Sequence, residues 1–424
     1  MKGALIFIGN ELVSGAIENT NSIFAGRVLT AYGFDIGEIV TIPDELKIII
    51  KYLKTLVKKY DFLIISGGLG PTDDDITNLA VSKAFNLELK ENPDFLSAIY
   101  SAKEYKFSKN LAKKMALLPE STIPLSKNFS IAGYLLNIKE KPLFFLPGVP
   151  HQFKYLLETE VIPRLLKSKI NHKRENTKIL RFFDLNETDI NQFINTFPKK
   201  LLSRIKIGYY PVFPEVKLIL QAKDEKILRS FIEKLKEHLK IYLLSEEDES
   251  LPQVIGVLLK KRGAKIAVAE SCTGGLISSL ITSVSGSSSY FDRGFITYTP
   301  ESKVELLEVN PSTIEKFDVV SYEVAMEMAE GVKKKVGVNY ALSTTGYAGP
   351  TGGTSENPVG TVYIGFAYEN KVKSFRFSFP GERKDIQVLA SYTALDILRR
   401  YLLYGESFFS YRFADGIKEK IMGT

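Results

Sequence analysis

Short apolar runs alternate with amphipathic segments along the first 150 residues. The apolar runs predict strands at residues 4–8, 36–42, 61–65 and 143–146, and the amphipathic segments predict helices at 19–32 and 44–58. A polar, glycine-bounded turn is predicted at residues 9–15. Strands that alternate with helices indicate a parallel sheet that binds ligands at its carboxyl edge.

The middle of the chain has the pattern of a small α+β module. Strands are predicted at residues 179–185, 205–210 and 216–222, and the helix at 224–242 places Ile227, Phe231, Leu235 and Leu239 on one face. A polar, basic stretch at 162–177 reads as a linker before the module, and the acidic stretch 245–250 with Pro252 marks its end. The module has the size of an RNA-binding module, but no GxxG loop accompanies it, which favours a structural spacer.

In the last third, the apolar run 264–268 leads through a short turn into the helical pattern 276–283. Further strands are predicted at 294–298 and 340–343. We therefore expect domains at residues 1–165, 176–246 and 252–404, with an appended tail at 405–424.

Composition narrows the functional classes. A chain of 424 residues exceeds what one core usually supports, and its single cysteine excludes an internal disulfide. No apolar run approaches the roughly 20 residues of a membrane span. The 56 Lys and Arg residues against 49 Asp and Glu form no basic arm, so nucleic acid is an improbable partner. We expect a soluble, cytoplasmic protein without a membrane partner.

The turn after the 264–268 run carries candidate chemistry. Ser271, Cys272 and Thr273 stand between the strand and two glycines that precede the helix. Backbone N–H groups at a helix start are free to bind an anion or an oxyanion, and glycines allow a ligand to approach the main chain. The alternative is that Ser271 and Thr273 only cap the helix.

A second candidate site follows the strand at 61–65. Gly67, Gly68 and Gly70 form a loop whose amides can cradle phosphate. Asp73, Asp74 and Asp75 then supply hard oxygens for a divalent cation. The alternative is a tight turn with an acidic helix start, which the helix dipole favours.

Motifs in both halves resemble one family. GNELVSG (9–15), NTN (19–21), GGLGPTDDDIT (67–77) and PGVP (147–150) are similar to the amino-terminal half of the CinA family of competence/damage-inducible proteins. AESCTGG (269–275), the segment 298–303, TGYAGPTGG (345–353), NPVGTV (357–362) and FPGER (379–383) are similar to its carboxyl-terminal half. The chain departs from the family pattern at His151, Gln152 and Gln387.

The resemblance implies a fold and two activities. The fold is α/β: a molybdopterin-binding-like domain with a parallel or mixed sheet between helices, the α+β module, and an α/β amidohydrolase domain. The implied activities are deamidation of nicotinamide mononucleotide without a cofactor and hydrolysis of ADP-ribose with a divalent metal ion. The family also implies a homodimer.

The resemblance further implies the residues of each site. Those of the carboxyl-terminal substrate site are Thr273, Gly274, Gly346, Ala348, Gly349 and Arg383. Those of the amino-terminal substrate site are Glu11, Asn21, Gly67, Gly68, Gly70 and Thr72. The implied metal ligands are Asp44, Asp74 and Asp75.

The order of residues limits the catalytic chemistry. All 3 histidines precede Ser271, so a Ser-His-Asp triad within the last domain is impossible, and a neutral lysine is the usual substitute base. Lys303 is the candidate, because it follows a predicted strand by one short loop and matches the lysine of the family; Tyr298 could relay its proton or fix it. Cys272 is the rival nucleophile, but Ser271 fits the family pattern. The loop 346–353 offers backbone donors for an oxyanion.

A second hypothesis is a binding or adaptor protein. In this hypothesis the amino-terminal half recognises a pterin or nucleotide, and the chain acts in DNA uptake through a partner. Ser271 and Lys303 favour an enzyme for the carboxyl-terminal half, whereas a glycine-rich loop with aspartates can bind a ligand without catalysis.

Overall fold

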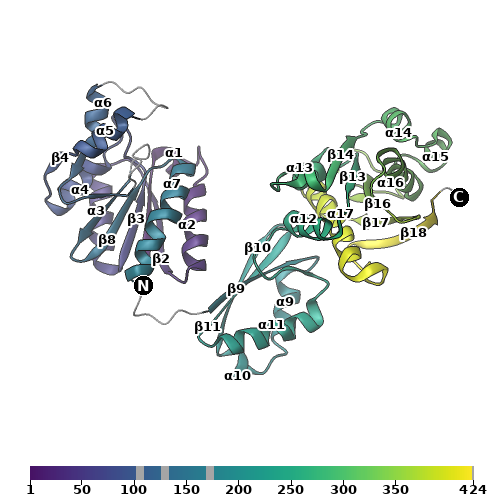
Figure 1. Cartoon of the computed structure of the whole chain (residues 1–424), viewed down its shortest axis with the longest axis horizontal. Helices are drawn as coiled ribbons and strands as arrows, with labels where there is room; N and C mark the ends of the chain where they lie inside the picture. Colours follow the sequence, from purple (N-terminus) through teal and green to yellow (C-terminus); the bar gives the residue numbers. More distant parts are fainter. Residues whose placement is uncertain (102–108, 126–132, 169–175, 423–424) are drawn as a thin grey trace. The chain divides into compact units, whose positions relative to one another are not determined.

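The computed structural model describes residues 1–101, 109–125, 133–168 and 176–422. The chain divides into two compact units, Met1–Glu175 and Asn176–Thr424, which are described separately (Figure 1). Among the described residues, no helix combines the length and apolar character needed to cross a membrane.

The first unit is an α/β domain. Its strands are β1 (Lys2–Ile8), β2 (Asp35–Ile42), β3 (Phe62–Ser66), β4 (Leu89–Glu91), β5 (Leu117–Pro119), β6 (Ile123–Pro124), β7 (Tyr134–Ile138) and β8 (Lys141–Leu146). Its helices are α1 (Asn10–Val13), α2 (Thr20–Ala31), α3 (Leu46–Lys59), α4 (Thr77–Phe85), α5 (Pro93–Ser101), α6 (Lys109–Ala116), α7 (Pro150–Leu156) and α8 (Ile162–Ser168), with a π-helical turn at Leu157–Val161.

The main sheet of this unit has the order β2-β1-β3-β8-β7-β6. The strands β2, β1, β3 and β8 are parallel, and β7 and β6 are antiparallel to their neighbours. Alternate residues of β1 enter two different cores: Ile6 packs with α3 and α4, whereas Phe7 packs with α2 and α7. Helices therefore cover both faces, and the predicted α/β sheet is confirmed (Figure 1).

Two local predictions in this unit differ from the structure. The turn predicted at residues 9–15 contains the one-turn helix α1. The stretch predicted as a linker begins with helix α8, because Ile162 and Leu165 are buried in the core. Residues 169–175 of that stretch lie outside the described residues.

The second unit begins with the α+β module. It consists of β9 (Asn176–Phe183), α9 (Glu187–Ile194), α10 (Lys199–Leu202), β10 (Ile205–Val212), β11 (Glu215–Ala222), α11 (Glu225–Leu239) and β12 (Leu243–Ser245). The strands form an antiparallel sheet in the order β10-β11-β9-β12. The face of α11 that carries Phe231, Leu235 and Leu239 is buried, as its amphipathic pattern predicts.

A six-stranded mixed sheet forms the rest of the unit. Its strands are β13 (Ile266–Glu270), β14 (Phe291–Ile296), β15 (Tyr340–Gly346), β16 (Thr361–Tyr368), β17 (Lys371–Ser378) and β18 (Ala414–Ile421), in the order β14-β13-β15-β16-β17-β18. Its helices are α12 (Leu251–Arg262), α13 (Leu276–Thr282), α14 (Pro300–Leu307), α15 (Pro311–Phe317), α16 (Tyr322–Val336) and α17 (Arg383–Tyr404), with short 3-10 turns at Ser287–Ser289 and Gly405–Phe408.

The appended tail predicted at residues 405–424 is wrong. Strand β18 pairs antiparallel with β17 along its length, and Phe409 and Tyr411 are buried in the core of the unit. The sequence signal is weak because β18 is an edge strand with charged, mostly exposed residues.

Buried charges join the module to this sheet domain. The side chains of Asp396, Arg399 and Arg400 on α17 are fully buried, and Asp396 accepts hydrogen bonds from both arginines. Arg400 also contacts Asp184 at the end of β9 at 2.9 Å, and Arg399 donates to the carbonyl oxygen of Leu243 in β12 at 2.9 Å. The module is therefore attached to α17 by one buried ion pair, between Arg400 and Asp184, and by a hydrogen bond from Arg399 to the backbone of β12.

We predict that Asp396→Asn lowers the free energy of unfolding by about 3–5 kcal/mol, because one partner of a buried ion pair is lost and charge stays uncompensated. Urea denaturation of the purified chain measures the change. The matched control is Glu225→Gln, which removes an exposed partner of Arg229 and should cost about 0.5 kcal/mol or less. Equal effects of the two substitutions would contradict the prediction.

Candidate active site

Strand β13 lies between β14 and β15 and delivers Ser271 to the carboxyl edge of the sheet. The Ser271 amide donates to the carbonyl oxygen of Thr344 on β15 at 3.0 Å, which extends the parallel ladder by one residue. Only 8% of Ser271 is exposed. The serine is thus fixed by the central strands rather than by a surface loop.

The start of α13 is occupied by a carboxylate of the protein itself. Glu270, which is fully buried, accepts hydrogen bonds from the amides of Gly275, Ile277 and Ser278 at 2.8–3.0 Å. It also accepts from the hydroxyls of Thr273 and Ser278. The prediction that these amides are free to bind a ligand anion is therefore wrong, because an internal anion fills the position.

Lys303 lies in the first turn of α14, and its side chain reaches Ser271. Its Nζ is 3.2 Å from the Oγ of Ser271 and 2.8 Å from the carbonyl oxygen of Thr297. Lys303 is 1% exposed, and this burial lowers the pKa of its amine to about 8. A substantial fraction of the amine is therefore neutral near physiological pH and able to accept a proton.

Cys272, the rival nucleophile, is held in its unreactive, protonated form. Its side chain is 5% exposed and belongs to the hydrophobic core of the domain. Burial raises the pKa of the thiol to about 12. Because the thiolate rather than the thiol is the nucleophile, the structure favours Ser271 over Cys272.

Arg383 and Tyr298, both exposed, lie together at the mouth of the pocket that Ser271 and Lys303 line. One guanidinium nitrogen of Arg383 donates to the Tyr298 hydroxyl at 3.0 Å, and the other donates to the carbonyl oxygen of Gly349 at 2.7 Å. Tyr298 is 57% exposed. Its hydroxyl hence contacts Arg383, and the structure does not bring it into a hydrogen bond with Lys303, where a proton relay was expected.

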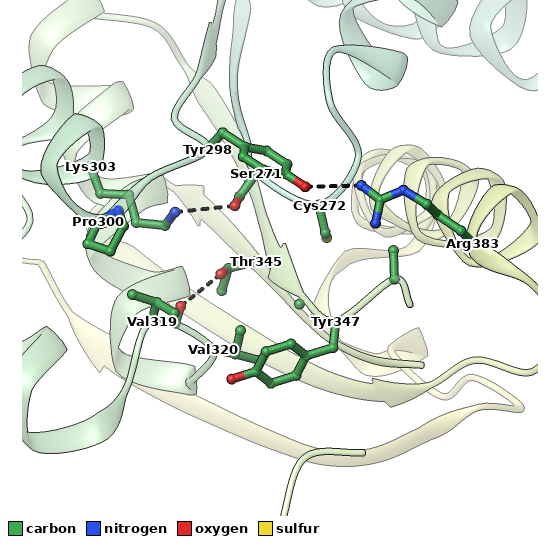
Figure 2. A pocket seen from close by; sticks show the side chains of 12 residues that line it. Ser271, Cys272, Tyr298, Pro300, Lys303, Val319, Val320, Thr345, Tyr347 and Arg383 are labelled. Carbon is green, nitrogen blue, oxygen red and sulfur yellow. Dashed lines mark hydrogen bonds between the residues drawn. The ribbon is translucent and has the colours of Figure 1, made fainter. Parts of the chain in front are cut away.

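These side chains surround a cavity of about 190 Å³ (Figure 2). Its lining combines the candidate residues with an apolar wall and comprises Ser271, Cys272, Tyr298, Pro300, Lys303, Val319, Val320, Thr345, Gly346, Tyr347, Ala348 and Arg383. Lys303 and Arg383 enter it from different elements, α14 and α17. The pocket thus has a buried amine beside the Ser271 hydroxyl and a cation at its mouth.

Three of the predicted substrate residues do not line this cavity. The Thr273 hydroxyl bonds to Glu270 and to the Thr344 hydroxyl, both at 2.8 Å. Gly274 has a φ of +59°, which suits the turn that carries Ser271. Gly349 supplies the carbonyl oxygen that holds Arg383. These residues shape the site without facing the ligand space.

Sequence reasoning missed several contributors. Val319, Val320 and Tyr347 line the cavity. Gln387, noted in the sequence only as a departure from the family pattern, donates to the carbonyl oxygen of Cys272 at 2.9 Å. Tyr347 belongs to the TGYAGPTGG motif, which could have drawn attention to it. The valines follow α15 and carry no recognisable signal, because apolar residues in a loop usually indicate only packing.

The amino-terminal candidates surround a separate cavity of about 620 Å³ in the first unit. The structure brings most of them to its lining: Glu11, Asn21, Asp44, Gly67, Gly68, Gly70, Asp74 and Asp75, with Gln152 beside them. Thr72 is not among the lining residues; instead its amide and hydroxyl donate to the Asp75 carboxylate at 2.8 and 2.5 Å. Asp75 therefore closes the glycine loop.

The glycine loop is held close to neighbouring backbone. Gly67 has a φ of +105°, and a Cβ there would lie 2.1 Å from the carbonyl oxygen of Ile8. The Gly67 amide donates to the carbonyl oxygen of Leu146 at 3.2 Å. The Gly67 amide is therefore unavailable to phosphate, contrary to the prediction. Only the later amides of the loop remain as donors to a phosphate.

The acidic side chains of this cavity influence each other. Burial, and then the charges of Glu11, Asp74 and Asp75, raise the pKa of Asp44, although the Asn10 amide donates to it. Among the described residues, however, no three His, Cys, Asp or Glu side chains are placed to hold a metal ion. The predicted ligands Asp44, Asp74 and Asp75 thus do not fit a metal site formed by protein groups alone.

Both halves of the chain match models of known protein families. A family model described as the CinA C-terminal domain matches residues 248–402, and one described as a probable molybdopterin binding domain matches residues 4–167. A CinA-like protein of Desulfotalea psychrophila is 41% identical over 94% of this chain and 98% of its own length. A putative competence-damage inducible protein of Caldicellulosiruptor saccharolyticus is 36% identical over 95% of this chain and 100% of its own.

Among solved structures, the competence/damage inducible protein CihA from Agrobacterium tumefaciens matches 35% of this chain and 92% of its own. The sequence identity is 37% and the TM-score 0.35.

Proposed function

We propose that this chain, which belongs to the CinA family, deamidates nicotinamide mononucleotide with Ser271 as nucleophile and Lys303 as base. The observation that carries the proposal is the 3.2 Å contact between the buried Lys303 amine and the Ser271 hydroxyl. The substrate is inferred from the resemblance of the carboxyl-terminal motifs to those of the family. A serine paired with a lysine provides amide hydrolysis without histidine.

Acylation begins when the neutral Lys303 amine accepts the Ser271 proton. The Ser271 oxygen then attacks the carboxamide carbon of the substrate, and a tetrahedral intermediate forms. The carbonyl oxygen of Thr297, 2.8 Å from Nζ, accepts one lysine N–H and orients the lone pair toward Ser271. The ammonium form of Lys303 next protonates the amide nitrogen, which leaves as ammonia.

Deacylation repeats the same proton transfers with water. Lys303, neutral again, removes a proton from a water molecule that attacks the acyl-enzyme carbonyl. Collapse of the second tetrahedral intermediate returns the proton from Lys303 to the Ser271 oxygen. Nicotinate mononucleotide is released and the free enzyme is restored.

Two backbone amides are suited to stabilise the tetrahedral oxyanion. Cys272 and Ala348 both line the cavity, and no other described residue accepts a hydrogen bond from their amides. The Tyr347 amide, by contrast, is used by the carbonyl oxygen of Thr361 at 2.9 Å. We assign the oxyanion to the amides of Cys272 and Ala348, since each such donor typically contributes about 2.7–4 kcal/mol.

Arg383 is assigned to the substrate phosphate. Its guanidinium is held at the mouth of the pocket by Gly349 and Tyr298. A planar guanidinium binds phosphate oxygens through paired N–H groups. The phosphate thus stays at the mouth while the carboxamide reaches Ser271.

For the amino-terminal half we propose binding and hydrolysis of ADP-ribose, with a divalent cation that arrives bound to the diphosphate. The supporting observation is the acidic lining of the 620 Å³ cavity, where neighbouring carboxylates contribute to the raised pKa of Asp44. Those charges repel a bare diphosphate and favour one that carries a cation.

The nucleophile is tested by ammonia release from nicotinamide mononucleotide. Ser271→Ala should lower kcat by at least about a thousandfold, because the acyl-enzyme is lost. Cys272→Ala should retain most of the activity, since the thiol is buried and protonated. The reverse pattern would move the chemistry to Cys272, and an inactive wild-type chain would contradict the proposed function.

The pH profile tests the base. Because only the neutral amine acts as base, kcat/KM should rise about tenfold per pH unit below the Lys303 pKa of about 8 and level off above it. Lys303→Arg should be inactive at every pH from 6 to 10, because arginine stays protonated. An active arginine variant would reduce Lys303 to an electrostatic anchor.

Calorimetric titration with ADP-ribose tests the amino-terminal half. Binding should weaken by about tenfold or more when Mg²⁺ is replaced by EDTA, as expected when cation-assisted charge neutralisation is lost. Asp44→Asn should reduce this dependence on Mg²⁺, while deamidation at Ser271 continues. The matched control is Asp73→Asn, because Asp73 is fully exposed and does not line the cavity. Binding unaffected by EDTA, or equal losses in both variants, would refute the cation-assisted site.

A further inference from the structure

Tyr347 forms part of the cavity wall, and a carboxylate lies behind it. Its ring packs with Val320, another lining residue, and Figure 2 shows it beside that valine. Its hydroxyl donates to the Oδ2 of Asp318 at 3.0 Å. Burial and this hydrogen bond raise the pKa of the Tyr347 phenol, which therefore stays protonated. The ring thus lies between the cavity and a negative charge.

Asp318 adopts a backbone conformation that favours glycine. Its φ is +68° and its ψ is 160°, a region in which a non-glycine residue is strained. Two hydrogen bonds hold it there: Oδ1 accepts from the Val319 amide at 2.6 Å, and the Asp318 amide donates to the carbonyl oxygen of Ile314 at 2.9 Å. A side chain at a position where glycine would be unstrained indicates that the carboxylate itself has a task.

The proposed substrate carries charges of both signs. Its phosphate is negative, and its pyridine nitrogen is bonded to ribose, so the ring has a permanent positive charge. Arg383 at the mouth matches the phosphate, and Lys303 is neutral when it acts as base. Among the residues that line the cavity there is no carboxylate. Two aromatic side chains, Tyr298 and Tyr347, line the cavity, and the Tyr298 hydroxyl accepts a hydrogen bond from Arg383. Among the described residues no cation is bonded to Tyr347, which is therefore the aromatic ring better suited to the positive pyridine.

We propose that Tyr347, polarised by Asp318, is a specificity-determining residue that recognises the pyridinium charge of the substrate through a cation–π contact. Donation of the phenol proton to a carboxylate moves electron density into the ring, which strengthens its attraction for a cation. This inference rests on the proposed deamidase function. It explains how the site would prefer an oxidised, charged nicotinamide ring over a neutral one.

The test compares two ligands that differ in ring charge. Nicotinamide mononucleotide and its 1,4-dihydro form share the carboxamide, ribose and phosphate, but the dihydro ring is neutral. Calorimetry on the Ser271→Ala chain measures both dissociation constants without turnover. The charged ligand should bind about tenfold more tightly than the neutral one, a difference of about 1.4 kcal/mol.

Asp318→Asn and Tyr347→Leu, each added to Ser271→Ala, should weaken binding of the charged ligand about tenfold and leave the dihydro ligand unchanged. Asparagine keeps the size of Asp318 and tolerates positive φ, so the dihydro ligand reports whether the pocket is intact. The matched control is Glu369→Gln: Glu369 accepts from the Tyr401 hydroxyl at 2.9 Å and does not line the pocket. This variant should preserve the preference.

Equal losses for both ligands, or an unchanged preference in both variants, would overturn the inference and leave the deamidase proposal standing. If the Ser271→Ala chain binds neither ligand, and the wild-type chain releases no ammonia, the proposed function fails and the inference fails with it.

Discussion

The energetic cost of a charged, unpaired amine at a buried position is the constraint on which the carboxyl-terminal site depends. Lys303 is 1% exposed, and among the described residues no carboxylate lies within ion-pair distance of it. Lys373 in the same domain is also buried but is paired with carboxylates: it is 8% exposed and contacts Glu406 at 2.7 Å and Glu419 at 3.0 Å. Because Lys303 lacks such partners, burial favours its neutral form, and a neutral amine is what a base requires.

The same turn that presents Ser271 also keeps a carboxylate from pairing with Lys303. Glu270 directly precedes Ser271, and an acid turned toward the amine would hold Lys303 charged. The structure directs that carboxylate into the start of α13, where five hydrogen-bond donors surround it. One interaction thus stabilises the serine turn, satisfies the first amides of the helix, and leaves the lysine without a counter-charge.

The sequence predicts those parts of the fold that depend on periodicity. The central strands and amphipathic helices are found near their predicted positions, because alternation and helical spacing reflect burial directly. The serine and lysine of the site were also predictable, from a motif and from the absence of a later histidine. Strand β18 was missed because its stability comes from pairing with β17, a contact distant in sequence for which its own residues give little signal. The anion site predicted at α13 failed for a related reason: sequence spacing shows where amides are free of helix partners, but not that Glu270 folds back onto them.

The two cavities place opposite electrostatic demands on their ligands. In the carboxyl-terminal cavity the Lys303 amine lacks a counter-charge. Arg383 at the mouth is hydrogen-bonded to neutral groups, so a phosphate that bound it would displace no carboxylate. The amino-terminal cavity is lined by carboxylates and by no Lys or Arg side chain of the described residues. Repulsion between the carboxylates contributes to the raised pKa of Asp44. The phosphate ligand that we propose for the first cavity would be attracted directly, whereas the one proposed for the second would have to bring positive charge with it. Salt should consequently weaken the two proposed binding reactions through different charges: the guanidinium in one, and the proposed ligand-borne cation in the other.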